Sequence, residues 1–506
     1  MRLVPLLTAA LSFLQPHRDV LGAAAPENHL TERQSSGRST PLLATFPGQA
    51  VLPTLQEILT LNATNGTFLP LQNIQGDILV GMKKQTERLV FFQINSASGF
   101  RSALKTYLPQ ITSTATLISP AANQPLAFVN IGFSQTGLTA LGITDDLNDA
   151  EFASGMWADA ANLGDDPSKW VSPFKGTAIH GVFVLGSDQA SYLDQYQSAI
   201  SSTFGSSISV LTTISGAARP GDQAGHEHFG FLDGISQPAI GGWTTNTLPG
   251  QAIVPNGVIL ARRLGDTATR PSWALDGTFM AFRWFQQLVP EFNKWTLDNA
   301  VQPPPLAGVT LNAQDAADFL GARMFGRWKS GAPLDLAPTV DDPALGADPQ
   351  RNNLFDYGDA LLDETKCPFS AHIRKTNPRL DLPLLSINNH AIRSSIAYGP
   401  EVSASESASN TTSQDRGLIF VEYQSVIANG FRFQQIAWAN TANFPPAKLE
   451  TPGLDAVIGQ GTPRTSGGLD PNNQTKMFTV PQFVVPKGGE YFFVPSIPAL
   501  TSEFAT

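Results

Sequence analysis

Apolar positions along the chain follow two rhythms: short continuous or alternating runs typical of β-strands, and longer stretches with the spacing of an amphipathic helix. The runs that predict strands are 88–94, 126–133, 178–185, 278–285 and 417–423. The stretches that predict helices are 99–107, 190–204 and 426–438. Because the two kinds of element are interleaved in the same style along both halves of the chain, the pattern predicts an α+β fold in two similar halves.

The same pattern divides the chain into four parts. They are a leader at 1–33, a Ser-, Thr- and Pro-rich extension at 34–68, a first half at 69–236 and a second half at 237–506. No internal repeat of solenoid length and no heptad pattern is present, so the sequence favours a globular protein over a repeat array.

The leader has the pattern of an export signal. Arg2 is followed by an apolar run at 3–14 and by small residues at 22–25. The apolar run is too short to cross a bilayer, and a buried N-terminal helix is the alternative. Four Asn-x-Ser/Thr sequons also agree with a secretory route. They begin at Asn62, Asn65, Asn410 and Asn473. We therefore expect a secreted, extracellular glycoprotein without a membrane partner.

Composition narrows the class further. The 506 residues are 42% hydrophobic, which excludes a disordered chain. The formal net charge of −10 argues against a nucleic-acid partner, because phosphate backbones require a basic surface. Cys367 is the only cysteine, so no internal disulfide can form. Stability must then come from the core, from glycans or from a bound cofactor.

Several common catalytic patterns are absent from the sequence. It contains no CxxC or HExxH zinc motif, no GxxxxGK[ST], no GxSxG and no paired GxGxxG. Three strings remain that would be unusual as pure structure. They are 230–238, 367–379 and 391–399.

Each candidate in these strings has an ordinary structural alternative. Asp233 precedes a glycine, and an Asp-Gly pair most often forms a turn. His226 and His228 are either two metal ligands or hydrogen-bonded loop histidines. His372 would ordinarily be a satisfied interior histidine. A single imidazole is nevertheless sufficient for an iron that is held mainly by a porphyrin.

Taken in order, the strings resemble those of the dye-decolorizing peroxidases, specifically the secreted fungal branch. The matching segments are Gly-x-x-Asp-Gly at 230–234, a histidine segment at 371–375, an arginine segment at 392–396 and a C-terminal segment at 488–495. The resemblance extends from about residue 69 onward. It implies a haem b enzyme of two ferredoxin-like halves, each an antiparallel sheet flanked by helices (the dimeric α/β-barrel superfamily), with the haem mostly in the second half. It also implies reduction of hydrogen peroxide and oxidation of dyes, phenols and lignin-related aromatics.

The resemblance assigns roles to four residues. His372 is implied to be the proximal iron ligand, and Asp455 the acceptor of its second ring proton, although a turn residue is the alternative for Asp455. Asp233 is implied to be the distal acid/base and Arg393 the distal cation. Because a free carboxylic acid titrates near ~3.9 and an imidazole near ~6.5, we expect activity to persist in acid.

Further residues are implied around the haem. Leu418 and Phe420 match apolar distal residues, and as strand residues they would be buried on any hypothesis. Arg374 is expected to bind a haem propionate, with a surface ion pair as the alternative. His228 is expected near the haem edge.

Bulky dyes cannot reach an iron in a narrow pocket, so electrons must travel through oxidisable side chains. Trp438, which matches a surface tryptophan of the family, and Tyr398 are the candidates. The spacing of Ile427, Phe431 and Trp438 on one helical face indicates core packing as the alternative.

An acidic stretch could also supply oxygen ligands to Mn²⁺, with a solvated loop as the alternative. Its residues are Asp341, Asp342, Asp348, Asp356, Asp359, Asp363 and Glu364. We expect a monomer or weak dimer. Two other functions stay open: a non-catalytic haem-binding or iron-release protein on the same fold, and a non-haem metal oxidase that uses His226 and His228. The classical secreted fungal peroxidases are disfavoured because they need several disulfides.

Overall fold

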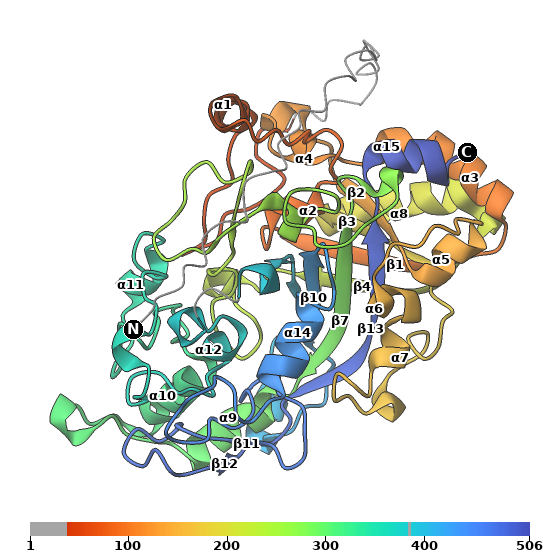
Figure 1. Ribbon diagram of the computed structural model, residues 1–506. Coiled ribbons are helices and arrows are strands. Elements are labelled where there is room, and N and C mark those ends of the chain that lie inside the picture. The colour runs from red at the N-terminus through yellow and green to blue at the C-terminus, as the bar shows by residue number, and fades with distance from the viewer. Residues whose placement is uncertain (1–37, 383–385) are drawn as a thin grey trace, which may run out of the picture. The chain divides into compact units, whose positions relative to one another are not determined.

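The computed structural model describes residues 38–382 and 386–506, and its centre is an antiparallel sheet of nine strands (Figure 1). The first half contributes β1 (Thr86–Ile94), β2 (Phe128–Phe133), β3 (Gly181–Ser187) and β4 (Ile208–Ala217). The second half contributes β7 (Thr278–Gln287), β8 (Ile392–Arg393), β9 (Ile396–Tyr398), β10 (Gly417–Gln424) and β13 (Val484–Val494). The strand order is β4-β1-β3-β2-β13-β7-β10-β8, and β9 also pairs with β10.

The sheets of the two halves meet at β13, the last strand of the chain. β13 pairs with β7 along most of its length and with β2 at Phe493, which lies opposite Phe133. The sheet therefore runs without interruption from one half into the other. Two small sheets lie outside it, β5 (Ala239–Ile240) with β6 (Ile253–Val254) and β11 (Thr465–Ser466) with β12 (Phe478–Thr479).

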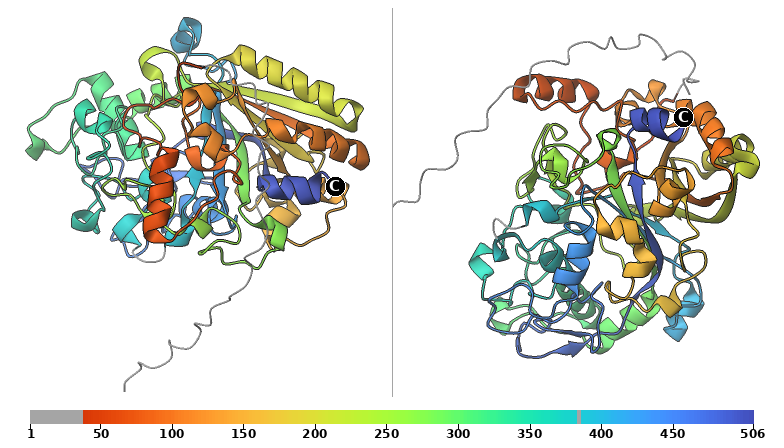
Figure 2. Two further views of the ribbon diagram at one scale, coloured as in Figure 1. Left: turned by 90° about the horizontal axis from the view of Figure 1, so that it is seen from above. Right: turned by 45° about the vertical axis from the view of Figure 1, so that its right-hand side comes forward.

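Helices accompany the sheet in both halves. The extension carries α1 (Leu55–Asn65). In the first half the helices are α2 (Asp77–Val80), α3 (Ala97–Tyr107), α4 (Thr114–Leu117), α5 (Gln135–Ala140), α6 (Ala150–Ser154), α7 (Met156–Asp159) and α8 (Ala190–Phe204). In the second half they are α9 (Val289–Asp298), α10 (Ala313–Phe325), α11 (Pro343–Ala347), α12 (His372–Thr376), α13 (Ala404–Ser409), α14 (Phe431–Phe433) and α15 (Ile497–Ala499). Figure 2 shows α3 and α8 side by side, where Phe100 and Phe204 pack together.

The predicted strands and helices are present, with bounds that differ by up to three residues, except for one helix that is shorter than predicted. The helix expected over 426–438 begins only at Phe431, and residues 434–439 are wound as a π-helix. Side chains hold the backbone before it in a turn: Ile427 N–H donates to Asp149, and Phe431 N–H donates to Gln424. These competing acceptors replace the hydrogen bonds of a first helical turn.

Of the two predicted N-terminal segments, the leader lies outside the described residues. The expected extension carries α1, which begins with a capping box formed by Thr54 and Glu57. Searched over the described ranges, the chain has no helix that combines the length and the apolar character needed to cross a bilayer.

The junction of the two halves yields a stability prediction. Phe493 is fully buried and packs against Phe279 and Trp273. We expect Phe493→Ala to lower the free energy of unfolding by about 3–5 kcal/mol, because the cavity left behind cannot be refilled. Urea unfolding followed by tryptophan fluorescence and by circular dichroism should show one shared transition.

The control is Val210→Ala, since Val210 is exposed on β4. It should change the free energy of unfolding by no more than about 0.5 kcal/mol. Two separate transitions in the Phe493 variant would contradict the continuous sheet.

Candidate active site

A cavity of about 220 Å³ lies in the second half, and the three strings singled out in the sequence all contribute to its wall. Asp233 comes from the segment that links the halves, Arg393 from β8 and His372 from the start of α12. Leu418 and Phe420 of β10 also line the cavity, as predicted.

The loop that carries Asp233 depends on its two glycines. Gly230 and Gly234 have φ values of +98° and +80°, in the left-handed region that other residues rarely adopt. A Cβ atom on Gly234 would also lie 2.3 Å from Nε2 of Gln49. Gly234 N–H donates to Oδ1 of Asp233. The Gly-x-x-Asp-Gly spacing thus aims the carboxylate as well as turning the chain.

Asp233 and Arg393 form an ion pair at the cavity wall. Nη1 of Arg393 lies 2.5 Å from Oδ1 of Asp233, and Nη2 donates to the carbonyl of Ser236. Burial alone would raise the pKa of Asp233, but the guanidinium outweighs it, and the pKa is lowered. Oδ2 of Asp233 accepts no hydrogen bond from the described residues. The carboxylate is therefore held ionised with one oxygen available.

His372 is oriented by Asp455, as predicted. Nδ1 of His372 lies 2.8 Å from Oδ2 of Asp455, which is fully buried. Oδ1 of Asp455 accepts the N–H groups of Val457 and Ile458. Burial would lower the pKa of His372, but the Asp455 carboxylate raises it. With Nδ1 engaged, Nε2 is the nitrogen left for a ligand in the cavity.

The rest of the cavity suits a large apolar group that carries negative charge at its edge. Its apolar wall includes Phe231, Ile235, Phe325, Ile373, Leu418, Phe420, Phe431, Val457 and Ile458. Arg327 and Arg379 also line it, and no carboxylate of the described residues lies within ion-pair distance of either. A haem, with an apolar macrocycle, an iron and two propionates, fits this donor set.

The sequence reasoning missed these two arginines. Burial lowers the pKa of Arg327 to about 9, and the positive charge of Arg379 acts in the same direction. Arg379 has φ +51°, a strained conformation for a residue with a side chain. Its Nη1 donates to the carbonyls of Gly250, Asn353 and Phe355. The burial of Arg327 and the backbone conformation of Arg379 are not visible in the sequence, in which Arg379 is simply the last residue of an Asn-Pro-Arg string.

The prediction that Arg374 binds a propionate is not supported. Its guanidinium is fully buried outside the cavity wall and forms a bidentate ion pair with Asp381. It also donates to the carbonyls of Cys367 and Ala360. Arg374 follows His372 by two residues, but its guanidinium forms its hydrogen bonds inside the core and not at the cavity.

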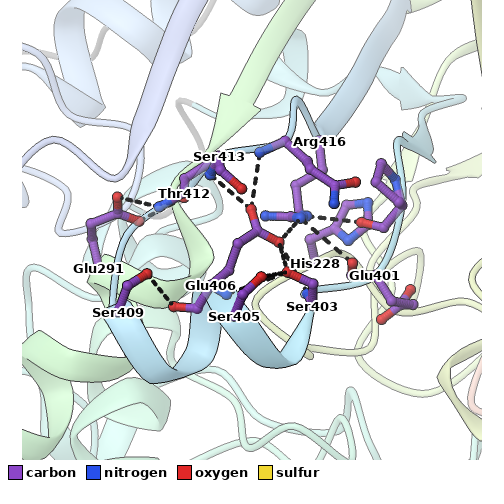
Figure 3. A network of polar contacts seen from close by, with 12 residues as sticks. His228, Glu291, Glu401, Ser403, Ser405, Glu406, Ser409, Thr412, Ser413 and Arg416 are labelled. Atoms are coloured by element: carbon purple, nitrogen blue, oxygen red, sulfur yellow. Dashed lines mark hydrogen bonds and ion pairs between the residues drawn. The ribbon is translucent and has the colours of Figure 1, made fainter.

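His228 does not line the cavity either, so its predicted position at the haem edge is not supported by the cavity wall. Its Nε2 lies 2.8 Å from the carbonyl of Tyr398, and burial lowers its pKa to about 4. Figure 3 shows His228 next to a polar network around Glu406 of α13 and Arg416. Glu406 accepts hydrogen bonds from Arg416 and Ser403, so this network fixes the loop between β9 and β10.

The two candidates for electron transfer lie in different surroundings. Trp438 lines the cavity and is only 3% exposed, so the expected surface position is wrong. It stacks on Phe444 with the ring centroids 5.3 Å apart. Tyr398 is buried beside the sheet, and its hydroxyl donates to Asp415, whose side chain is exposed. Trp284 packs against Tyr398.

The acidic stretch does not assemble a manganese site. Over the described ranges, no three His, Cys, Asp or Glu side chains come together in a way that could hold a metal ion. Most of these carboxylates serve the local backbone instead: Asp342 caps α11, Asp356 accepts from Gly358 N–H and Asp363 accepts from Thr365 N–H. The solvated-loop alternative describes them better.

Comparison with known proteins agrees with this fold and site. A family model described as "DyP dimeric alpha+beta barrel domain" matches residues 73–220. A dye-decolorizing peroxidase of Auricularia auricula-judae is 50% identical over an alignment of 516 positions that covers 99% of each chain. Another, of Exidia glandulosa, is 50% identical over 477 residues, which cover 92% of each chain. A solved dye-decolorizing peroxidase in complex with 2,6-dimethoxyphenol is 69% identical, with a TM-score of 0.85, over 87% of this chain and 100% of that chain.

The fold and site define an α+β oxidoreductase built from two ferredoxin-like halves. The chain belongs to the dye-decolorizing peroxidase family. It is accordingly a peroxidase that uses hydrogen peroxide to oxidise dyes, in a family that implies haem.

The His372–Asp455 pair predicts a pH-dependent contribution to stability in the haem-free protein. A raised histidine pKa stabilises the fold below about pH 6.5, and a lowered aspartate pKa stabilises it above about pH 4. Asp455→Asn should therefore lower the free energy of unfolding by about 1.5–3 kcal/mol near pH 5 and by less near pH 9. Urea unfolding at the two pH values measures this, and an equal loss at both would contradict it.

Proposed function

We propose that this chain is a secreted haem b peroxidase that oxidises phenols and lignin-related aromatics as well as dyes. The observation that carries the proposal is that the Asp233–Arg393 ion pair and the His372–Asp455 hydrogen bond line one cavity. A carboxylate with a free oxygen, a fixed cation and an oriented imidazole are the groups that a haem peroxidase needs.

His372 would bind the haem iron through Nε2. Arg327 and Arg379 would neutralise the propionates, since each lines the cavity without a carboxylate partner among the described residues. When bound, haem supplies a redox-active iron at which the O–O bond of hydrogen peroxide is cleaved. The apolar wall formed by residues such as Leu418 and Phe420 keeps bulk water out of the site.

Asp233 and Arg393 divide the work on hydrogen peroxide. Asp233 accepts the first peroxide proton at Oδ2, because Oδ1 is already engaged by Arg393 and Gly234. It then returns that proton to the oxygen that leaves as water. Arg393 stabilises the negative charge that develops on the peroxide oxygens.

Larger reductants would deliver electrons through side chains. Trp438 lies at the cavity wall, and Phe433, which packs against it, is exposed. Tyr398 offers a second route, since Asp415 can take the phenolic proton when the ring is oxidised. A methoxyphenol is bound in the structure of a related peroxidase, which supports lignin-related phenols as the substrate class. No site for Mn²⁺ is assigned.

Secretion is supported by the leader pattern and by three sequons. Asn65, Asn410 and Asn473 are exposed and suitable for glycans. Asn62 is buried, and neither polar atom of its side chain has a partner among the described residues, so we propose that it stays unmodified.

The alternatives account for fewer of the observations. A haem carrier would not need both Asp233 and Arg393 in contact at the cavity. A non-haem oxidase would need His226 and His228 to bind one metal ion, yet His228 bonds to a backbone carbonyl outside the cavity.

The distal pair gives a direct test of the mechanism. Asp233→Asn should slow the reaction with hydrogen peroxide by about 10²–10⁴-fold and Arg393→Leu by about 10²–10³-fold, while the Soret band remains. Stopped-flow absorption measures both. Because the pKa of Asp233 is lowered, the wild-type rate should persist in acid, and an optimum above neutrality would contradict the assignment.

Asp276→Asn is the matched control for charge loss. Asp276 also pairs with an arginine, Arg263, but lies outside the cavity wall. Its peroxide rate should equal that of the wild type.

The electron route is tested with Trp438→Ser. Turnover of a bulky dye should fall by about ten-fold or more, while small phenols that enter the cavity are oxidised at the wild-type rate. Trp295→Ser, on α9 beside Phe483, is the control. Unchanged turnover of both substrate classes by the Trp438 variant would exclude the relay.

A further inference from the structure

Two consecutive lysines, Lys83 and Lys84, are buried between α2 and β1, close to both distal residues. Buried lysines are rare unless they are paired, because the ammonium group loses its hydration. The two ammonium groups reach different partners, and each set of partners ends at one member of the Asp233–Arg393 pair.

Lys83 reaches Asp233 through Gln49 of the N-terminal extension. Nζ of Lys83 donates to Oε1 of Gln49 at 3.0 Å and to the carbonyl of Ala50 at 2.6 Å. Nε2 of Gln49 then donates to the backbone carbonyl of Asp233 at 2.9 Å. No carboxylate of the described residues pairs with Lys83, and burial lowers its pKa to about 8. The extension thus places the side-chain amide of Gln49 in hydrogen-bond contact with the loop that carries Asp233.

Lys84 reaches the residue next to Arg393. Its Nζ donates to the carbonyl of Ser394 at 2.6 Å and pairs with Asp77 at 3.2 Å and with Glu87. The hydroxyl of Ser394 donates to Asp77 at 3.0 Å. Tyr423 also donates to Asp77. The side chains of Lys84, Asp77 and Glu87 are fully buried, and the cluster holds Ser394 by both its carbonyl and its hydroxyl.

The backbone of the same loop completes the contact. The Ser394 hydroxyl lies 3.1 Å from the carbonyl of Gly81. Gln237, which is 3.1 Å from a Cβ built on Gly81, bonds to both the N–H and the carbonyl of Arg393. Gly81 and Lys84 therefore contact Ser394, the neighbour of Arg393, and Lys83 contacts Gln49, which supports Asp233.

We propose that Lys83 and Lys84 are positioning residues that set the contact between the Asp233 carboxylate and the Arg393 guanidinium. The proposal rests on the distal roles given under the proposed function. A buried ionic cluster adds little stability over an apolar replacement of the same volume. A displacement of about 1 Å at reacting groups, in contrast, can cost about 100-fold in rate.

Three holoenzyme variants test the proposal. Lys83→Met removes the ammonium group that donates to Gln49. Gln49→Met removes the hydrogen bond from the Gln49 amide to the Asp233 carbonyl, together with the acceptor for Lys83, without deleting a charge. Ser394→Ala removes the hydroxyl bonds while leaving the Lys84 cluster paired. The matched control is Ser187→Ala, since Ser187 is equally buried on β3 and its hydroxyl donates to Leu126, away from the cavity.

The readouts are the rate with hydrogen peroxide and the affinity for cyanide, followed by the Soret shift, because a positioned guanidinium at Arg393 would stabilise an anion in the cavity. We expect each of the three variants to lose about 10- to 100-fold in both, with unchanged haem content, while the control matches the wild type. Crystal structures of the variants should show a longer Arg393–Asp233 distance than a crystal structure of the wild type.

Wild-type rates and affinities in Gln49→Met and Ser394→Ala would overturn the proposal, even if Lys83→Met failed to fold. If the wild type itself showed no Soret band or no reaction with peroxide, the proposed function would fail instead. The distance in the crystal structures would then still decide whether the lysines position the pair.

Discussion

A carboxylate and a guanidinium that must stay in contact inside a cavity constrain the rest of this fold. Asp233 and Arg393 are 160 residues apart and belong to different segments, yet their charged atoms lie 2.5 Å apart. Each alone would be costly to bury, because desolvation disfavours the ionised form. Held together, they keep the carboxylate ionised, so that the site can accept a proton in acid as well as at neutral pH.

The supports of this pair come from the extension and from both halves of the chain. Gln49 of the extension bonds to Asp233, residues 81–84 of the first half contact the supports of Arg393, and β8 carries Arg393 itself. The continuous sheet through β13 gives these parts a common frame. The first half contributes Asp233 and its neighbours to the cavity wall, and residues 81–84 to the supports of the pair, so both halves belong to one functional unit.

The charges around the cavity indicate what it holds. His372 and Asp455 compensate each other, as do Arg393 and Asp233. Arg327 and Arg379 have only neutral partners among the described residues. Positive charge left over beside an apolar cavity is stabilised by an anionic ligand. Arg374 shows the contrast, because Asp381 compensates its charge and it takes no part in the cavity.

Much of the fold was accessible from the pattern of apolar residues, because strands and helices bury their faces at fixed periods. The bounds predicted for α8 match those observed. The turn before Phe431 was not predictable. Asp149, which accepts the N–H of Ile427, is distant in sequence, and Gln424, which accepts the N–H of Phe431, competes with the hydrogen bonds of a helix. Asp233, Arg393, His372 and Asp455 were found because their motifs carry the resemblance to a known family.

The sequence by itself determined the class of chemistry, through a Gly-x-x-Asp-Gly turn and segments whose residue types serve a haem site. Only the tertiary structure decided which charges remain uncompensated. Arg374 and Arg379 lie in one short string, but Arg374 forms an ion pair with Asp381, whereas Arg379 lines the cavity. The reason is physical: the state of a charged side chain depends on the groups packed around it in space, and most of those groups come from elsewhere in the chain.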